Sequence, residues 1–235
     1  LYFNTDKCKV LHIGKNNPLK DYYMKLGDNQ VRLGDCECEK DLGVTFDMNL
    51  NFDVHIQNAI NKANMMLGII RRTFVYMDEE SFLLLFKSLV RPHLEYGNII
   101  WCPFLKRQSA AIERVQRRAT KLLPNLKELS YPERLTALRL PSLKARRVRG
   151  DLIQTFKIFN QIDNVDINNF FVINPNDKTR NSVDKIFIQH SRTNTRKFCF
   201  SNRVAPLWNK LPKDVKIAHN LNKFKNLKKK KKVLK

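Results

Sequence analysis

The sequence lacks the motifs that mark most enzymes. It contains no Gly-rich phosphate loop, no H-E-x-x-H zinc motif and no recognisable pairing of a nucleophile with a base, so its motifs give no support to catalysis. Gly14-Lys15 is not preceded by the earlier glycine that a P-loop requires. The histidines are scattered along the chain, and a histidine without a nameable partner is more often a surface or core residue than a catalyst.

Long apolar runs and evenly paired cysteines are also missing. No run approaches the roughly 20 residues of a membrane-spanning helix, so we expect no membrane partner. Five cysteines, an odd number, argue against a disulfide framework and for a reducing, intracellular compartment. The Cys36-Glu37-Cys38 spacing matches no common zinc pattern, which favours incidental thiols. The chain shows no signal-peptide pattern and begins at Leu1 within an apparent strand, as expected of a piece of a longer protein.

Acidic side chains are scarce relative to basic ones. The 235 residues include 44 Lys and Arg against 22 Asp and Glu, which gives a formal charge of +22 and a pI of about 10.0. Residues 1–50 hold 7 basic and 8 acidic side chains, which leaves 37 basic and 14 acidic for residues 51–235. This surplus predicts an acidic partner, most often nucleic acid, contacted after residue 50. A hydrophobic content of 43% is ordinary for a globular chain.

Residue patterns predict a mainly helical fold with a small N-terminal α+β part. In residues 1–50, strand-like runs are expected at 8–14, 22–26, 30–33 and 40–47. From 52 to 75, apolar residues recur at three- and four-residue steps, which predicts a long helix. Asp78 is the expected N-cap of a second helix, which Pro92 should end or kink.

A third helix, expected from about Ser109 to Leu123, carries the densest group of cations in the stretch RVQRRATK. Its inward stripe is expected to be Ile112, Val115, Ala119 and Leu122. That arrangement turns four cations to solvent, namely Arg114, Arg117, Arg118 and Lys121. Glu113 should pair with Arg117 at a gain of only ~0.3 kcal/mol, which leaves most of the charge available to phosphates. The alternative is a basic face that is merely solvated.

Two further helix starts follow from capping patterns. Ser130-Tyr131-Pro132-Glu133 is an S-x-x-E capping box, and Ser142 is the expected cap of the next helix. That helix carries cations in its early turns, namely Lys144, Arg146, Arg147 and Arg149. Because cations oppose the dipole at a helix N-terminus by ~0.3 to 1 kcal/mol each, we expect a bound anion to offset them. Residues 160–195 should be loop, and 196–212 a packed element.

Several blocks, taken in order, carry a family likeness. FNTDKCKVLHIG, KDLGVTF, IQNAINKANMMLGIIRRTF, LFKSLVRPHLEYGNIIWCPF, IERVQRRATKLL, LSYPERLTALRLPSLKARRVRGDLI and FSNRVAPLWNKLP together resemble the C-terminal part of the reverse transcriptase of non-LTR retrotransposons, of the jockey and chicken-repeat kind. The likeness extends to about Phe224. It implies a division of the chain into a palm remnant (1–50), a helical thumb-like bundle (51–124) and a C-terminal helical region (125–224). Low-complexity lysine after that point predicts a disordered tail (225–235).

The resemblance also implies roles for particular residues. In that family the metal-binding aspartates lie upstream of the matched blocks, so this chain alone should bind template-primer without polymerising. No cofactor is expected in this chain, whereas the parent enzyme would need Mg²⁺. Lys7 matches a lysine proposed to neutralise the leaving pyrophosphate, and Leu42-Gly43 lies in the hairpin that supports the primer end.

The expected partner is RNA, DNA or an RNA–DNA hybrid, held through its backbone and shape with little sequence preference, and the expected place of action is the nucleus. Two alternatives stay open. The chain could be the end of an active polymerase, which an in-frame Asp-Asp turn upstream would reveal. It could instead be a host-adopted protein-interaction or general RNA-binding module, which a pull-down surviving nuclease treatment would favour. The sequence gives no indication of oligomeric state.

Overall fold

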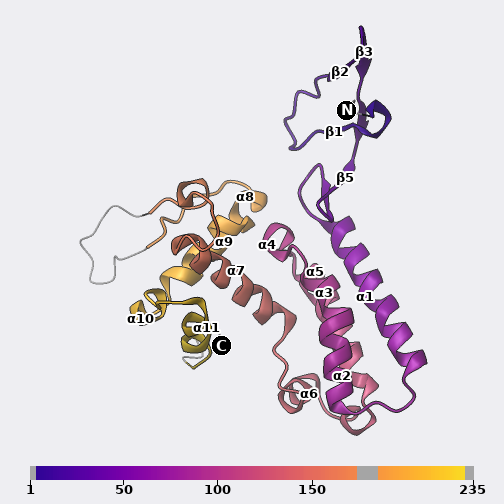
Figure 1. Ribbon diagram of the computed structural model, residues 1–235, viewed down its shortest axis with the longest axis vertical. Helices are drawn as coiled ribbons and strands as arrows, with labels where there is room; N and C mark the ends of the chain where they lie inside the picture. The colour runs from indigo at the N-terminus through magenta and orange to yellow at the C-terminus, as the bar shows by residue number, and fades with distance from the viewer. Residues whose placement is uncertain (1–3, 174–184, 231–235) are drawn as a thin grey trace.

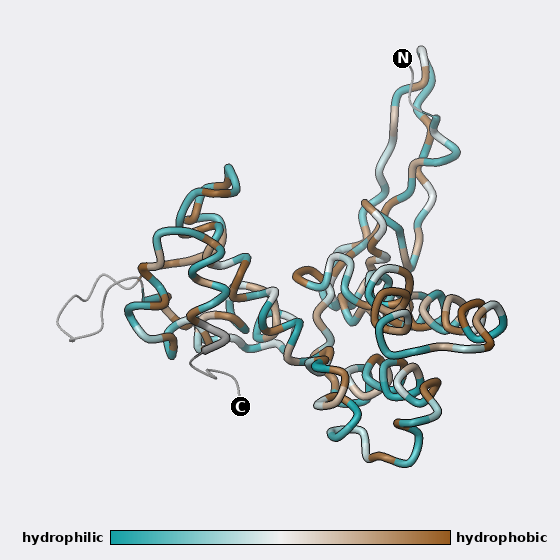
Figure 2. The backbone as a smooth tube through the Cα atoms, turned by 60° about the horizontal axis from the view of Figure 1, so that its bottom comes forward, coloured by the Kyte–Doolittle hydropathy of each residue, from teal (hydrophilic) through white to brown (hydrophobic). Residues whose placement is uncertain are grey.

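A computed structural model of the chain describes residues 4–173 and 185–230 (Figure 1). The structure is mainly helical (55% helix, 11% strand), with strands in the N-terminal region, as expected. The strands project from one end of a group of helices, and a second group of helices lies beside the first (Figures 1 and 2). None of the described helices is long and apolar enough to cross a membrane.

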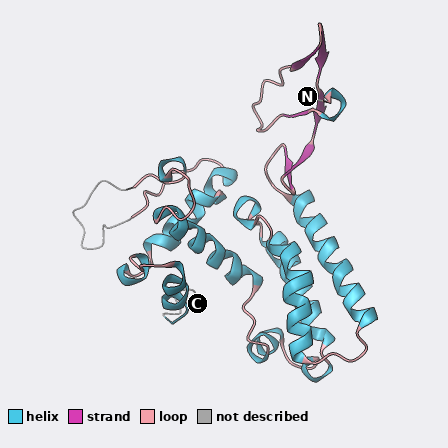
Figure 3. Cartoon of the chain, viewed as in Figure 1, coloured by secondary structure: helices cyan, strands magenta, loops and turns pink. Residues whose placement is uncertain are grey.

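The described N-terminal strands form three two-stranded sheets (Figure 3). A parallel pair, with Lys9 opposite Gly34, joins β1 to β4, and hairpins join β2 to β3 and β5 to β6. The bounds are β1 (Lys9–Leu11), β2 (Tyr23–Leu26), β3 (Asn29–Arg32), β4 (Gly34–Cys36), β5 (Cys38–Asp41) and β6 (Val44–Asp47).

The prediction of a single strand at 40–47 is wrong, because the chain reverses direction at Leu42 and Gly43. Both residues have positive φ, 43° and 84°. Two successive positive φ values are the pattern of a type I′ turn, which matches the right-handed twist of a hairpin. Leucine is an unusual residue for such a turn, since its Cβ disfavours the left-handed region.

Two helices of the first group begin where capping signals predict, whereas the third predicted helix begins at Lys106 rather than at about Ser109. The Asp78 side chain accepts from the N–H of Ser81 at 2.7 Å, and the Glu133 side chain accepts from the N–H of Ser130 at 2.7 Å. The interruption expected at Pro92 takes the form of a π turn at Phe86–Val90. The helices are α1 (Asp53–Thr73), α2 (Glu79–Leu85), α3 (Arg91–Glu95), α4 (Asn98–Trp101), α5 (Lys106–Ala119) and α6 (Tyr131–Ala137).

The second group of helices begins with α7 (Leu143–Phe159), whose expected cap Ser142 accepts from the N–H of Ala145 at 3.2 Å. The others are α8 (Asn194–Phe198), α9 (Phe200–Asn209), α10 (Lys213–Lys216) and α11 (Leu221–Lys230). Because α11 runs to Lys230, the disordered tail expected from residue 225 is helical at its start, and residues 231–235 lie outside the described residues. Residues 160–173 and 185–193 hold only a 3-10 turn (Ile167–Asn169) and an isolated bridge, as expected of a loop, and 174–184 lie outside the described residues.

Two hydrophobic cores divide the chain at a different place from the expected boundary at residue 124. The first core runs from Val44 to Leu143, because leucines after residue 124 pack with α1 and α5. The second core runs from Leu152 to Phe224. Helix α7 therefore begins in one core and continues into the other.

A buried ion pair ties the second core to the first. Arg203 of α9 donates from Nε and Nη2 to the carboxylate of Asp151 on α7, at 2.9 and 2.8 Å. Its Nη2 also donates to the carbonyl of Ile99 at 2.7 Å. The two side chains are only 10% and 4% exposed, so loss of either partner would leave a charge buried without compensation.

Candidate nucleic-acid interface

The four cations expected on the third helix point to solvent from α5 and the 3-10 turn that extends it (Thr120–Leu122). All four are exposed, and we refer to them as the α5 stripe: Arg114, Arg117, Arg118 and Lys121. On the inward side, Ile112, Val115 and Ala119 are buried as predicted, whereas Leu122 is half-buried.

Among the described residues, no carboxylate within salt-bridge distance neutralises the α5 stripe. Arg118 donates from Nη1 to the amide oxygen of Asn64 at 3.0 Å, a neutral partner. The guanidinium of Arg117 lies 4.9 Å from the ring centroid of Tyr131. The positive charge of the stripe therefore remains available to an anion.

The predicted pairing of Glu113 with Arg117 is not formed. The Glu113 carboxylate accepts instead from the hydroxyl of Tyr131 at 2.5 Å and from the N–H groups of Leu143 and Lys144 at 3.2 and 3.3 Å. Those N–H groups begin α7 and have no partner within the helix. Burial, and the bond to Glu113, raise the pKa of Tyr131 well above its usual value. Glu113 thus supplies negative charge at the N-terminus of α7.

The cations at the start of α7, which were expected to attract a bound anion, do not join the α5 stripe. Arg147 is only 3% exposed and donates to Ser109 Oγ at 3.0 Å, and burial lowers its pKa. Arg146 is half-buried and donates twice to Glu95, with Nη2 and Oε2 2.8 Å apart. Of these cations, Arg146 is therefore offset by a carboxylate of the chain itself. Arg149 is exposed.

Helices α1 and α5 run side by side in the same direction. The Asp53 carboxylate accepts from Arg107 Nη2 at 2.8 Å, and the Asn64 amide oxygen accepts from Arg118. In both contacts the two partners are 54 residues apart in the sequence, as expected of helices that run in parallel. Because Arg107 is paired with Asp53, the arginines of both helices that have no ion pair among the described residues lie in their C-terminal halves. Cations at the C-terminal end of a helix interact favourably with the helix dipole, which stabilises the fold whether or not a ligand is bound.

A groove of about 970 Å³ lies at those C-terminal ends, between α1, the α1–α2 loop and the turn after α5. Its cations are Arg71, Arg118, Lys121 and Lys127. Its apolar wall includes Phe74 with Val75 and Tyr76, which are 82% and 95% exposed. The carboxylate in its lining, Asp78, is engaged in capping α2, and that hydrogen bonding lowers its pKa. Cations beside exposed aromatic rings suit phosphates and bases together.

Lys7, Leu42 and Gly43 lie elsewhere. Leu42 is 85% exposed at the tip of the β5–β6 hairpin, and its carbonyl accepts from the hydroxyl of Tyr96 at 2.8 Å. The hairpin contacts the first turn of α1, where Thr45 N–H donates to His55 Nδ1 at 3.2 Å. Since the groove begins 16 residues further along α1, the helical rise separates the two by about 24 Å.

Lys7 is exposed at the end of a 3-10 turn (Thr5–Lys7) that precedes β1, and Figure 1 shows β1 farther from the helices than β5. The structure thus brings together the stripe on α5 but not the other predicted contacts. Sequence reasoning missed Arg71, Lys127 and the exposed Phe74–Tyr76 loop. The signal for Arg71 and the loop lay in the run RRTFVY (71–76), where two aromatic residues follow two arginines.

Comparison with known proteins found no family model, no curated protein and no solved structure that matches the chain.

Proposed function

We propose that the chain binds nucleic acid through the α5 stripe and the adjoining groove, as the template-primer-binding part of an RNA-directed DNA polymerase of the non-LTR retrotransposon type. The observation that carries the binding proposal is the stripe itself: four exposed cations on α5 and the 3-10 turn that extends it, without a carboxylate partner among the described residues. The ordered sequence blocks support the parentage. The proposed place of action is the nucleus.

The geometry favours contact with the phosphate backbone. From Arg114 to Lys121 the helix rises about 10 Å, which is the axial length of about three phosphates along one strand at ~3.4 Å each. Backbone contacts fix the position of a duplex and carry no sequence information. Beside the stripe, Phe74 and Tyr76 can stack on unpaired bases at the end of a duplex.

Polymerisation is not part of the proposal for this chain alone. In the resembled family, two metal ions held by upstream aspartates activate the reacting groups. Cations without those carboxylates can hold a substrate but cannot supply that activation. The parent enzyme would therefore provide Mg²⁺ and its ligands from outside these residues.

Fluorescence anisotropy with a labelled RNA–DNA hybrid tests the proposal. We expect saturable binding that weakens steeply as salt rises and that is equal for hybrids of unrelated sequence. Binding that is unchanged between low and high salt, or that requires one sequence, would contradict it. A protein partner retained after nuclease treatment, with no hybrid binding, would favour the host-adopted interaction module instead.

A further inference from the structure

A second concentration of positive charge lies where the two cores meet. A cavity of about 660 Å³, within the range of small-molecule sites, opens there, and no residue of the α5 stripe lines it. We call it the junction cavity. Six cations from the π turn, α3, the turn after α6, α7 and α11 line it: Lys87, Arg91, Arg139, Arg146, Arg149 and Lys225.

These cations have little compensating negative charge. Glu95 pairs with Arg146 and lies 3.6 Å from Arg91, so two guanidiniums share one carboxylate. All three side chains are about one-fifth exposed. Burial, together with repulsion from Arg146, lowers the pKa of Arg91. Among the described residues, no ion pair engages the other four cations of the cavity.

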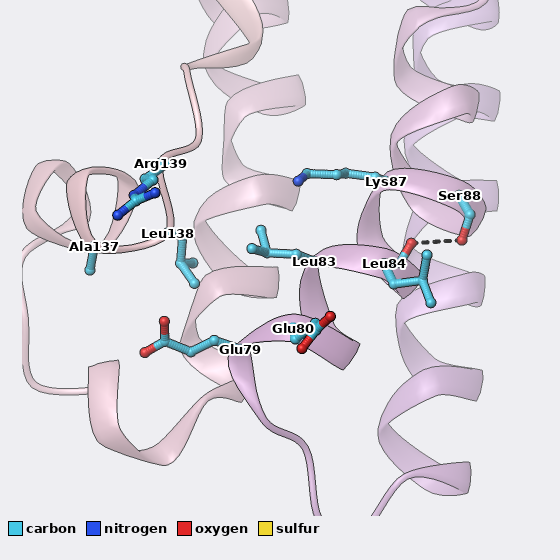
Figure 4. Close-up of a pocket in the computed structure, with 9 residues that line it drawn as sticks. All are labelled: Glu79, Glu80, Leu83, Leu84, Lys87, Ser88, Ala137, Leu138 and Arg139. Atoms are coloured by element: carbon cyan, nitrogen blue, oxygen red, sulfur yellow. Dashed lines mark hydrogen bonds between the residues drawn. The ribbon is translucent and has the colours of Figure 1, made fainter.

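A second cavity, lined by residues of α2, the π turn and the end of α6, has a different charge pattern. It shares Lys87 and Arg139 with the junction cavity but also holds Glu79 and Glu80. Figure 4 shows the two cations on opposite walls at one end and the two carboxylates at the other. The residues that line the junction cavity, by contrast, include no carboxylate.

The backbone at Arg139 follows from the end of α6, where this residue has a φ of 51°. Its N–H donates to the carbonyl of Thr136 at 3.1 Å, and the N–H of Leu140 donates to the carbonyl of Leu135 at 2.9 Å, which is the Schellman motif that commonly ends helices. This turn places Arg139 in the lining of the junction cavity.

We propose that the junction cavity binds a chain of closely spaced phosphates, as found in a free triphosphate or at the 5′-triphosphate end of a nucleic-acid strand. Guanidiniums bind phosphate oxygens in a two-pronged manner, so several arginines around one cavity suit several phosphates. Consecutive phosphates also carry their charges closer together than acidic side chains do. Because Lys225 comes from the second core and Arg139 from the first, the ligand bridges both. The site is separate from the nucleic-acid interface proposed above.

Isothermal titration of the full chain with sodium triphosphate tests this inference. We expect one site per chain, and at least ~10-fold weaker binding in Arg139→Gln/Arg149→Gln, which removes two exposed phosphate contacts. A matched control, Lys210→Gln/Lys213→Gln, removes the same charge from exposed lysines outside the cavity and should bind within about twofold of the wild type. Circular-dichroism melting without ligand checks that the variants are folded.

Three results would overturn the inference: no heat up to millimolar triphosphate, several equivalent sites per chain, or equal weakening in both double variants. Two further arms identify the source of the phosphates. Tight binding of ATP and triphosphate alike supports a free ligand, whereas preference for a 5′-triphosphate over a 5′-hydroxyl RNA supports a strand end. The hybrid assay separates the two proposals, because triphosphate binding without hybrid binding removes only the proposed function.

Discussion

Removal of two charges from the C-terminal end of the α5 stripe should cause a measurable loss of nucleic-acid affinity. Six cations border the proposed path of the backbone: Arg71, Arg114, Arg117, Arg118, Lys121 and Lys127. At ~0.9 per contact, six phosphate contacts give a log-log salt slope of about −5.4, and Arg118→Gln/Lys121→Gln should reduce it to about −3.6. At about 0.1 M salt the two lost contacts correspond to roughly 60-fold in affinity.

Anisotropy titrations with a labelled RNA–DNA hybrid, between about 50 and 300 mM salt, measure both quantities. The exposed position of both side chains predicts a change in folding stability within about 0.5 kcal/mol, so the effect on binding can be separated from unfolding. The control Lys210→Gln/Lys213→Gln has the same net charge and should keep the wild-type slope. If the two variants show equal slopes, net charge rather than this surface governs binding, and the reasoning is refuted.

Replacing Leu42 by Asn should raise the free energy of unfolding by about 1 kcal/mol, because Leu42 and Gly43 both have positive φ and Asn-Gly suits this turn; urea denaturation giving equal or lower stability would count against it. Asp151→Asn should lower the free energy of unfolding by about 3 to 5 kcal/mol, because the buried Arg203 keeps its charge without a carboxylate partner. If thermal unfolding shows a loss below about 1 kcal/mol, the ion pair does not hold the two cores together. Burial, and nearby lysines, hold the pKa of His55 below its usual value, so its contribution to stability is complete above pH ~6.5 and is lost as the pH falls through its folded pKa. In His55→Gln the decline in stability from neutral to acidic pH should become shallower, and an unaltered decline would contradict this assignment.

Helices with strong local signals could be predicted from the sequence. The buried apolar face of α1 and the helix caps at Asp78, Ser130 and Ser142 depend on residues only a few positions apart, and the structure confirms them. The hairpin at Leu42 was not predicted from its residues, because leucine is atypical where φ is positive.

The candidate site could be predicted only where it lies on one helix. The outward display of Arg114 follows from the period of α5. The burial of Arg147 and the pairing of Arg146 depend on Ser109 and Glu95, which are distant in sequence and approach only through packing. Sequence periodicity contains no information on such partners.

The same limit explains why the groove was missed. Arg71 and Lys127 line the same groove because α1 and α5 run in parallel, with Asn64 opposite Arg118. That register is a property of the packed pair. Local patterns specify each helix separately.

Hydrogen exchange of the full chain, with and without the RNA–DNA hybrid, tests most directly whether the cationic end of α1 and α5 contacts nucleic acid. We expect slower exchange on binding in the C-terminal halves of both helices and in residues 74–78. Protection confined to α8–α11, or spread evenly over the basic surface, would contradict the proposed interface.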